Sequence, residues 1–464
     1  MTDNKIREIR VIRENPRFRR YPEYKESGVE WIGEIPRHWE ILKAKHVGSS
    51  NPPKNNPKTA RLKDKLVVFL PMERVHTNGT IDQELRLPYS QLKNGYTYFE
   101  EGDILIAKVT PCFENGKIVH IKNLATSVGF GSTEFIVIRP DLQRVFPPFL
   151  YYILRSDPLR SIGKHFMTSA IGLKRVPTEF VENFQIPIPV YQEQAQIANF
   201  LDRKTEQIDE LIRIKERRIE LLQEQRTALI NQAVTKGLDP NVEMKLSGVE
   251  WIGEIPAHWK VLRTKHVGSS NPSKNNTKTA CLKDELVVFL PMERVHTDGT
   301  TDQELRLPYS QLKNGYTYFE EGDILIAKVT PCFENGKIVH IKNLATSVGF
   351  GSTEFIVIRP DLQKVFPPFL HYILYNAPLR SIGKHFMTSA IGLKRVPTEF
   401  VENFRIPIPT YQEQTQIADF LDHKTQQIDE LIAIEHRKIE RLKEYRQSLI
   451  SEAVTGKIDV QGAV

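Results

Sequence analysis

The sequence predicts a mixed α/β protein built from two strand-rich domains, each followed by a long helix. Residues 27–190 and 247–410 align at a constant offset of 220 without a gap, and the same offset relates residues 192–234 to 412–454. The first segment of each copy holds short runs of strand-forming residues between turn signals. The second segment shows the apolar spacing of a helix.

The composition is that of an ordinary globular protein. Of the 464 residues, 40% are hydrophobic and 26% are charged, which provides apolar mass for two to four domains and excludes disorder as the main state. Lys and Arg number 64 against 57 for Asp and Glu, for a net charge of +7. This mild basic excess favours a polyanionic partner without requiring one.

The cysteines and the apolar runs limit the environment in which the protein works. Cys112, Cys281 and Cys332 form no CxxC pair, so neither a disulfide framework nor a structural metal is expected. Apolar runs such as residues 66–70 and 149–154 are far shorter than the roughly 18 residues that a membrane span needs. We therefore expect a cytoplasmic protein with no membrane contact.

Each domain is predicted to be compact and closed by prolines. The Gly102 and Gly116 regions carry turn signals between the strand-forming runs, and Pro187 and Pro189 end the domain because neither can donate to a strand ladder. The predicted strands lie in 103–108, 117–122 and 134–139, and the predicted short helices lie in 150–159 and 179–184.

The segment that follows each domain is predicted to be one helix of about 40 residues, roughly 60 Å long. Gly237 and Pro240 end the first helix. About 15 of 43 positions differ between the two helices, yet every residue of the apolar stripe is unchanged. The residues predicted to pair the helices are Ile197, Leu201, Ile208, Leu211, Ile212, Ile219, Leu222 and Leu229, with Ile417, Leu421, Ile428, Leu431, Ile432, Ile439, Leu442 and Leu449.

An apolar stripe of this length needs a partner, and the stripe of the other copy is the simplest one. We expect an antiparallel coiled coil in which a pseudo-two-fold axis relates the two domains. The alternative is that each helix folds back onto its own domain. The expected division is a basic N-terminal arm (1–24), domain 1 (25–190), helix 1 (191–236), a linker (237–246), domain 2 (247–410), helix 2 (411–456) and a C-terminal tail (457–464).

An ordered set of motifs carries a family resemblance. The chain has GEIPRHW at 33–39 at the entry to domain 1, then KVTPCFENGK at 108–117, GFGSTEF at 129–135, GLKRVP at 172–177, and IPIP at 186–189 followed by QEQ at 192–194. With AVTGKID at 453–459, the set covers nearly the whole chain. It resembles the specificity subunit of type I restriction-modification systems.

The resemblance implies a subunit without chemistry of its own that reads a bipartite sequence in double-stranded DNA. It implies two copies of an adenine methyltransferase subunit as partners, and often restriction subunits. No cofactor is expected on this chain, because S-adenosylmethionine belongs to the methyltransferase and ATP with Mg²⁺ to the restriction partner. Members of this family usually carry two dissimilar domains, whereas about 18 of roughly 164 positions differ here. We therefore expect an interrupted palindrome as the target.

Polar and basic residues in the loops are the candidate DNA contacts, because Lys and Arg bind phosphate while Asn, Ser, Thr, Glu and Lys read base edges. The same residues could instead be framework. The candidates are Lys54, Asn55, Asn56, Lys58, Lys108, Thr110, Glu114, Asn115, Lys117, Ser132, Thr133, Ser169, Lys174 and Arg175, and in the second copy Lys274, Asn275, Asn276, Lys278, Lys328, Thr330, Glu334, Asn335, Lys337, Ser352, Thr353, Ser389, Lys394 and Arg395.

Two other functions remain open. The chain could be an assembly scaffold whose domains bind protein without reading bases. It could also be a self-contained nuclease or methyltransferase, although residues 51–54 lack the aromatic side chain that would stack on a flipped base, and no carboxylate cluster for Mg²⁺ is evident. No catalytic residue is predicted.

Overall fold

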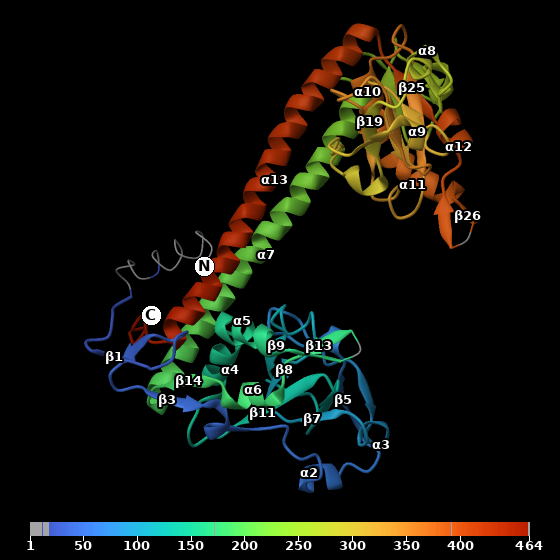
Figure 1. Ribbon diagram of the computed structural model, residues 1–464. Helices are drawn as coiled ribbons and strands as arrows, with labels where there is room; N and C mark the ends of the chain where they lie inside the picture. Colours follow the sequence, from blue (N-terminus) through green and yellow to red (C-terminus); the bar gives the residue numbers. More distant parts are fainter. Residues whose placement is uncertain (1–11, 13–17, 171, 391, 463–464) are drawn as a thin grey trace. The chain divides into compact units, whose positions relative to one another are not determined.

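The computed structural model describes residue 12 and residues 18–170, 172–390 and 392–462 (Figure 1). The chain forms two compact units, of which unit 1 comprises residues 1–216 and 436–464 and unit 2 comprises residues 217–435. Each unit contains one strand-rich domain and a part of both long helices. The division drawn from the sequence treats each helix as a segment of its own, whereas each helix is shared between the units because it is longer than one domain.

The domain of unit 1 is built on two four-stranded sheets. In one sheet the order is β4-β11-β8-β9 and all neighbours are antiparallel. In the other the order is β6-β5-β10-β7, with β5 and β10 parallel. The strands are β4 Gly48–Ser50, β5 Leu66–Leu70, β6 Arg86–Pro88, β7 Thr97–Phe99, β8 Ile104–Ala107, β9 Ile118–His120, β10 Gly129–Gly131 and β11 Phe135–Pro140.

Three two-stranded sheets and several short helices complete this domain. Antiparallel pairs form between β1 Tyr24–Glu26 and β2 Glu34–Pro36, between β3 Glu40–Lys43 and β14 Gln185–Ile188, and between β12 Thr168–Ala170 and β13 Leu173–Arg175. The helices are α2 Pro57–Ala60, α3 Tyr89–Leu92, α4 Pro147–Arg155, α5 Asp157–Phe166 and α6 Thr178–Asn183, with 3₁₀ turns η1 Ala44–His46 and η2 Met72–Arg74.

The predicted helix at 150–159 is wrong as a single element, because the chain forms α4 and α5 with a break at Ser156. Ser156 is extended, with ψ of 154°. Pro158 stands in the first turn of α5, where its missing N–H costs nothing, but it could not continue α4 since it cannot donate to a carbonyl four residues back.

The core of the domain explains why these segments are strands. Every residue of β8 is buried, and β11 buries Phe135 and Val137 against Val68, Leu70 and Phe99. Such continuous apolar runs suit strands that are covered on both faces. The turns between them use Gly102 and Gly116, both at positive φ, as the sequence predicts.

Unit 2 repeats the domain of unit 1 element by element. Its strands are β15 Met244–Leu246, β16 Glu254–Pro256, β17 Lys260–Arg263, β18 Gly268–Ser270, β19 Leu286–Leu290, β20 Arg306–Pro308, β21 Thr317–Phe319, β22 Ile324–Ala327, β23 Ile338–His340, β24 Gly349–Gly351, β25 Phe355–Pro360, β26 Thr388–Ala390, β27 Leu393–Arg395 and β28 Arg405–Ile408. Its helices are α8 Thr277–Ala280, α9 Tyr309–Leu312, α10 Pro367–Tyr375, α11 Ala377–Phe386 and α12 Thr398–Asn403, with turns η3 Thr264–His266 and η4 Met292–Arg294.

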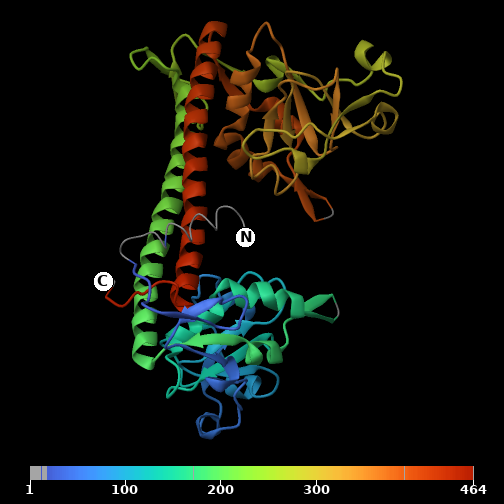
Figure 2. The ribbon, with the colours of Figure 1, turned by 60° about the vertical axis from the view of Figure 1, so that its left-hand side comes forward.

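The long helices are α7 Tyr191–Lys236 and α13 Tyr411–Val454, and within each unit their segments lie side by side in both ribbon views (Figure 2). In unit 2, Arg218 pairs with Glu435 at 3.3 Å and Arg226 with Asp429 at 3.1 Å. The partner number falls as the residue number rises, so the helices run antiparallel there. In unit 1, Asp209 pairs with Arg446, the same pair as Asp429 with Arg226 moved by the repeat.

The apolar stripe is buried along most of its length, but Leu211 and Leu431 correct the prediction. Their side chains are 47% and 40% exposed, whereas Ile212 is 8% exposed. Side chains at adjacent positions on a helix point about 100° apart. The contact between the two helices is narrow enough to cover only one of two adjacent side chains.

The ends of the stripe pack on domains as well as on the other helix. In unit 2, Ile417 and Leu421 of α13 and Ile230 and Val234 of α7 belong to one core that includes Phe369 of α10. The start of α13 therefore packs on its own domain, as the alternative expects, whereas the end of α7 packs on the domain that follows it in the chain.

Residues 19–24 and the segment 456–461 meet in unit 1. The Tyr24 hydroxyl donates to the Gly456 carbonyl at 3.0 Å, the Asp459 N–H donates to the Arg19 carbonyl at 2.6 Å, and the Gln461 amide donates to Glu193 at 2.9 Å. The greater part of the predicted basic arm, including its arginines at 7, 10, 13 and 17, lies outside the described residues. In the part of the chain that the structure describes, no helix is long and apolar enough to cross a membrane.

Candidate nucleic-acid interface

Three polar segments meet at one edge of each domain. They are the loop after β8, the turn after β10, and the β12–β13 hairpin. The Thr110 N–H donates to the Lys174 carbonyl at 2.9 Å, and the Lys174 N–H donates to Thr110 Oγ1 at 3.2 Å. The Lys108 N–H donates to the Glu134 carbonyl at 2.8 Å. Segments that are distant in sequence are thus joined through their backbones.

A bidentate ion pair holds the base of the hairpin. Arg175 donates from Nε to Glu134 Oε2 at 2.9 Å and from Nη2 to Oε1 at 2.8 Å. The hydrogen bonds from Arg175 lower the pKa of Glu134 below its usual value, and in return the pKa of Arg175 is raised. Arg175 therefore positions the hairpin, and its guanidinium is engaged within the domain.

Several predicted contacts have partners inside the domain. The Asn56 side chain caps α2, Lys117 Nζ donates to the Met72 carbonyl at 2.8 Å, and Ser132 Oγ accepts from the Glu134 N–H at 3.2 Å. Lys58 pairs with Glu100, and Glu114 lies 3.9 Å from Lys164. The exposed candidates are Asn55, Lys58, Glu114, Asn115, Thr133, Ser169 and Lys174, while Lys54, Lys108 and Thr110 are half-buried.

The segment 54–58 is not brought to the hairpin edge. Asn56 Nδ2 donates to the Tyr98 hydroxyl at 2.8 Å, and Lys58 pairs with Glu100, just beyond the end of β7. Because β7 runs antiparallel to β10, with Phe99 opposite Gly129, these groups lie toward the start of β10, whereas the turn at 132–134 follows its end.

Unit 2 places its candidates in the same way. Thr330 and Lys394 form the two hydrogen bonds that join Thr110 and Lys174 in unit 1. Arg395 pairs with Glu354, and Lys337 Nζ donates to the Met292 carbonyl at 2.8 Å. Asn276 caps α8, Lys278 pairs with Glu320, and Glu334 lies 3.8 Å from Lys384. The other candidates are the exposed Asn275, Asn335, Thr353 and Ser389 and the half-buried Lys274, Lys328 and Ser352.

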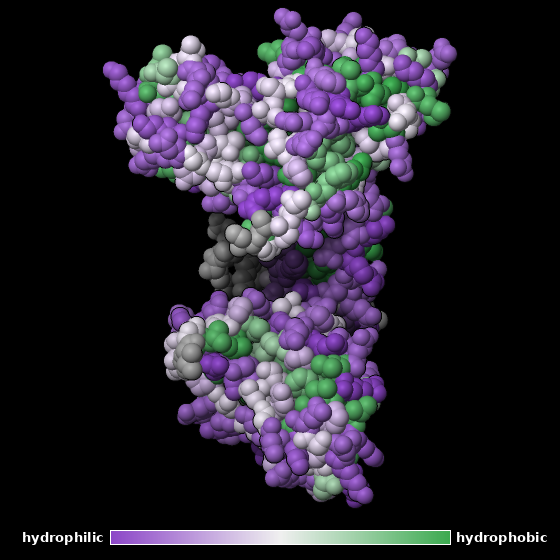
Figure 3. All heavy atoms as spheres, turned by 90° about the vertical axis from the view of Figure 1, so that its right-hand side faces the viewer, coloured by the Kyte–Doolittle hydropathy of each residue, from purple (hydrophilic) through white to green (hydrophobic). Residues whose placement is uncertain are grey.

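On the face of the protein that Figure 3 shows, most of the surface is hydrophilic and hydrophobic residues gather in a few groups. Two large hydrophobic side chains at the hairpin, Phe166 and Leu173, are 56% and 45% exposed. The tryptophans that bracket the GEIP motif belong to the framework, since Trp31 stacks on Phe184 at 5.2 Å and the buried Trp39 donates to Glu193 at 3.1 Å. Among the described residues, no group of His, Cys, Asp or Glu is arranged to hold a metal ion.

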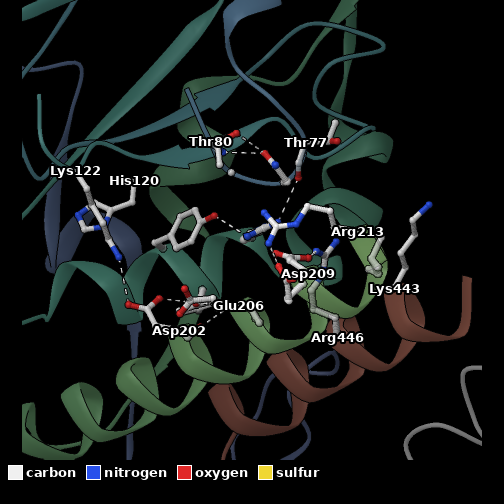
Figure 4. A pocket seen from close by; sticks show the side chains of 18 of the residues that line it. Thr77, Thr80, His120, Lys122, Asp202, Glu206, Asp209, Arg213, Lys443 and Arg446 are labelled. Carbon is white, nitrogen blue, oxygen red and sulfur yellow. Dashed lines mark hydrogen bonds and ion pairs between the residues drawn. The ribbon is translucent and has the colours of Figure 1, made fainter. Parts of the chain in front are cut away.

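Sequence reasoning missed a charged pocket of about 730 Å³ where the domain of unit 1 meets both long helices (Figure 4). Lys122 Nζ lies 3.2 Å from Asp202, the Tyr152 hydroxyl donates to Asp202 at 2.6 Å, and Arg446 pairs with Asp209. The two contacts of Asp202 hold α7 on the domain, and the Arg446–Asp209 pair joins α13 to α7. None of the predicted DNA contacts lines the pocket.

The two copies differ where the domains meet the helices. Tyr151 and Arg155, which hydrogen-bond to each other at 2.7 Å in unit 1, are replaced by His371 and Tyr375 in unit 2. There the guanidinium of Arg226 lies 5.3 Å from the centre of the Tyr375 ring. The substitutions between the copies were the signal that could have marked this junction.

Comparison with known proteins places these domains in a family. The family model described as "Type I restriction modification DNA specificity domain" matches residues 36–223 and 257–444. The type I restriction enzyme EcoEI specificity subunit of Escherichia coli is 37% identical over 198 residues, which are 42% of this chain and 32% of that protein. The chain thus spans about a third of the length of this relative and of the EcoAI subunit.

Other relatives match along nearly the whole chain. The type I restriction enzyme MjaX specificity subunit of Methanocaldococcus jannaschii is 25% identical over 93% of this chain and 96% of its own length. A solved chain from the assembly of a type I R-M system has a similar fold, with a TM-score of 0.68 at 17% identity, covering 90% of this chain and 98% of that one. The HsdS subunit from Thermoanaerobacter tengcongensis gives a TM-score of 0.50 at 19% identity, over 91% and 98% of the two chains. Two family matches that together cover most of the sequence show that this chain belongs to the type I restriction-modification DNA specificity family.

Proposed function

We propose that this chain is the DNA sequence-specificity subunit of a type I restriction-modification complex. The observation that carries the proposal is that both family-matching domains present the same edge, on which three polar segments are fixed to one another by backbone hydrogen bonds and by the Arg175–Glu134 pair or its counterpart. A preorganised edge of exposed Lys, Asn, Ser and Thr side chains suits DNA, since these side chains serve both phosphates and base edges.

The chain determines which DNA sequence is bound, and its partner subunits carry out the reactions. Two methyltransferase subunits that bind S-adenosylmethionine modify adenine at N6, and restriction subunits that use ATP and Mg²⁺ cleave unmodified DNA. The ion pairs of α7 and α13 leave many charged side chains on the outer helix faces, which are available to such partners. The chain itself acts as a non-catalytic scaffold.

The target is an interrupted palindrome. The repeat supports this, because residues 82–143 and 302–363 are identical and both hairpins have the same sequence, so each domain reads the same half-site. Antiparallel helices would relate the domains by a pseudo-two-fold axis and present the half-sites on opposite strands. The length of the helix pair then sets the unread spacer.

The test is equilibrium binding of the complex with its methyltransferase subunits to labelled DNA across a range of salt concentrations. We expect log Kd to change linearly with log salt concentration for all DNA. We also expect a specific duplex to outcompete random duplex by at least 10³-fold. Binding that shows no salt slope and no sequence preference would support a protein-binding scaffold instead.

A further inference from the structure

Two short antiparallel strands, β12 and β13 in unit 1 and β26 and β27 in unit 2, form a hairpin on each domain. In unit 2 the hairpin labelled β26 extends beyond the body of its domain (Figure 1). In unit 1, Thr168, Ser169, Gly172, Leu173 and Lys174 are all exposed. Gly172 turns the chain at a φ of +77°. The hairpin thus offers side chains and backbone that the rest of the domain leaves uncovered.

The two faces of the hairpin differ in their chemistry. Side chains alternate across a strand, so the directly opposed Ser169 and Lys174 share one face, while Arg175, opposite Thr168, lies on the other. Arg175 is turned toward Glu134 and anchors the ribbon. Ser169 and Lys174 are left as a pair of exposed polar groups with no protein partner at their side-chain ends among the described contacts.

The base of the hairpin is rigid although its end is exposed. The Val176 N–H donates to the Lys108 carbonyl at 2.8 Å, and Thr110 bonds Lys174 on both backbone groups. Just before the hairpin, Phe166 stacks on Phe180 with ring centres 5.0 Å apart. A ribbon fixed in this way loses little conformational freedom when it binds.

From this arrangement we infer that the β12–β13 hairpin of unit 1, and its counterpart β26–β27 in unit 2, enters the major groove and reads part of each half-site. Ser169 and Lys174 contact the base edges in unit 1, and Ser389 and Lys394 do so in unit 2. Arg175 and Arg395 are positioning residues. The inference rests on the proposed DNA-binding function.

The geometry and the side chains both fit this role. The major groove is about 12 Å wide and admits a two-stranded ribbon. A lysine donates to the O6 and N7 of guanine, and a serine hydroxyl can pair with donors or acceptors. Two other candidate DNA contacts, Asn56 and Lys58, are engaged in a helix cap and an ion pair, so they are less free to contact DNA.

The duplicated chain allows a test within one molecule. We would express the full chain with its methyltransferase subunits, carrying K174A, S169A or K394A alone, and map methylated adenines in genomic DNA. K174A should relax one base position in one half-site and leave the other half-site intact. K394A should do the same to the opposite half. Discrimination at that position should fall about 5- to 100-fold, as expected for one lost base contact.

The matched control is K93A, which removes an exposed lysine at the C-terminal end of α3 in the same domain, outside the candidate DNA contacts. The motif should be unchanged with K93A. The inference is overturned if K174A weakens methylation at all sites alike, which marks a phosphate contact, or if S169A and K174A both leave the motif as in the wild type. A wild-type complex that methylates no sequence motif would instead refute the proposed function itself.

Discussion

At the junction of unit 2, a histidine replaces a tyrosine among buried neighbours. Burial lowers the pKa of His371 to about 4, and that of His340 beside it to about 3. In unit 1, only His120 occupies this place, with its pKa lowered by burial to about 4, because position 151 is a tyrosine. The unit 2 junction therefore carries one more imidazole that must stay neutral.

This difference predicts a pH effect on unit 2. Between about pH 6.5 and 4 the unfolded chain binds protons that the folded histidines do not, so the unfolding free energy falls as the pH falls. H371Y should make the unfolding free energy depend less on pH, by at most about 1.4 kcal/mol per pH unit. Hydrogen exchange of peptides from 364–377, compared at pH 7.5 and 5.5, would measure it. The same peptides should stay pH-sensitive in a Y151H control, and an unchanged pH response in H371Y would contradict the prediction.

Residue type indicated the candidate contacts, but it could not separate ligands of DNA from ligands of the protein. Asn56, Lys117 and Arg175 have the chemistry of DNA contacts, yet a helix cap, a carbonyl and a carboxylate hold them. For Lys117 and Arg175 the partners, Met72 and Glu134, lie 45 and 41 positions away in sequence. Only the fold brings them together.

Among the elements, the long helices followed from the sequence most directly. An apolar stripe and a glycine after the last turn are local signals, so α7 begins and ends within the segment that periodicity indicates. The break between α4 and α5 depends on Pro158. The parallel pairing of β5 with β10 depends on contacts between segments that are distant in sequence. Periodicity carries no information about either.

The helix seam makes a prediction that separates two adjacent residues. I212A removes a side chain that is 8% exposed and should lower the unfolding free energy by about 2 kcal/mol. L211A removes one that is 47% exposed and should change it by less than about 0.5 kcal/mol. Urea unfolding of both variants provides the measurement. Equal losses in the two variants would mean that the seam lies elsewhere on the helix.

At the scale of the whole molecule, unit 1 is completed by the end of the chain. The contacts of Asp459 with Arg19 and of Gln461 with Glu193 have no equivalent across the ends of unit 2, which is continuous in sequence. The stability of one unit therefore depends on residues that lie more than 250 positions from its domain.

Deleting residues 457–464 should consequently loosen unit 1 alone. We expect faster hydrogen exchange in peptides from 19–39, because the backbone hydrogen bond of Asp459 to Arg19 and the side-chain hydrogen bond of Gln461 to Glu193 are lost. Peptides from 239–259 in unit 2 serve as the internal control, since their sequence differs and their contacts remain. Equal protection in the truncated and full-length chains would show that the C-terminal tail does not hold unit 1 together.

The two nearly identical domains lead to the central claim, that one chain recognises the same half-site sequence twice, in opposite orientations. The most direct measurement is the map of N6-methyladenine in cells that carry this chain with its methyltransferase subunits, compared with cells that lack it. We predict one new motif, an interrupted palindrome with identical inverted half-sites and a spacer of fixed length. An asymmetric motif, or a direct repeat of the half-site, would contradict the claim.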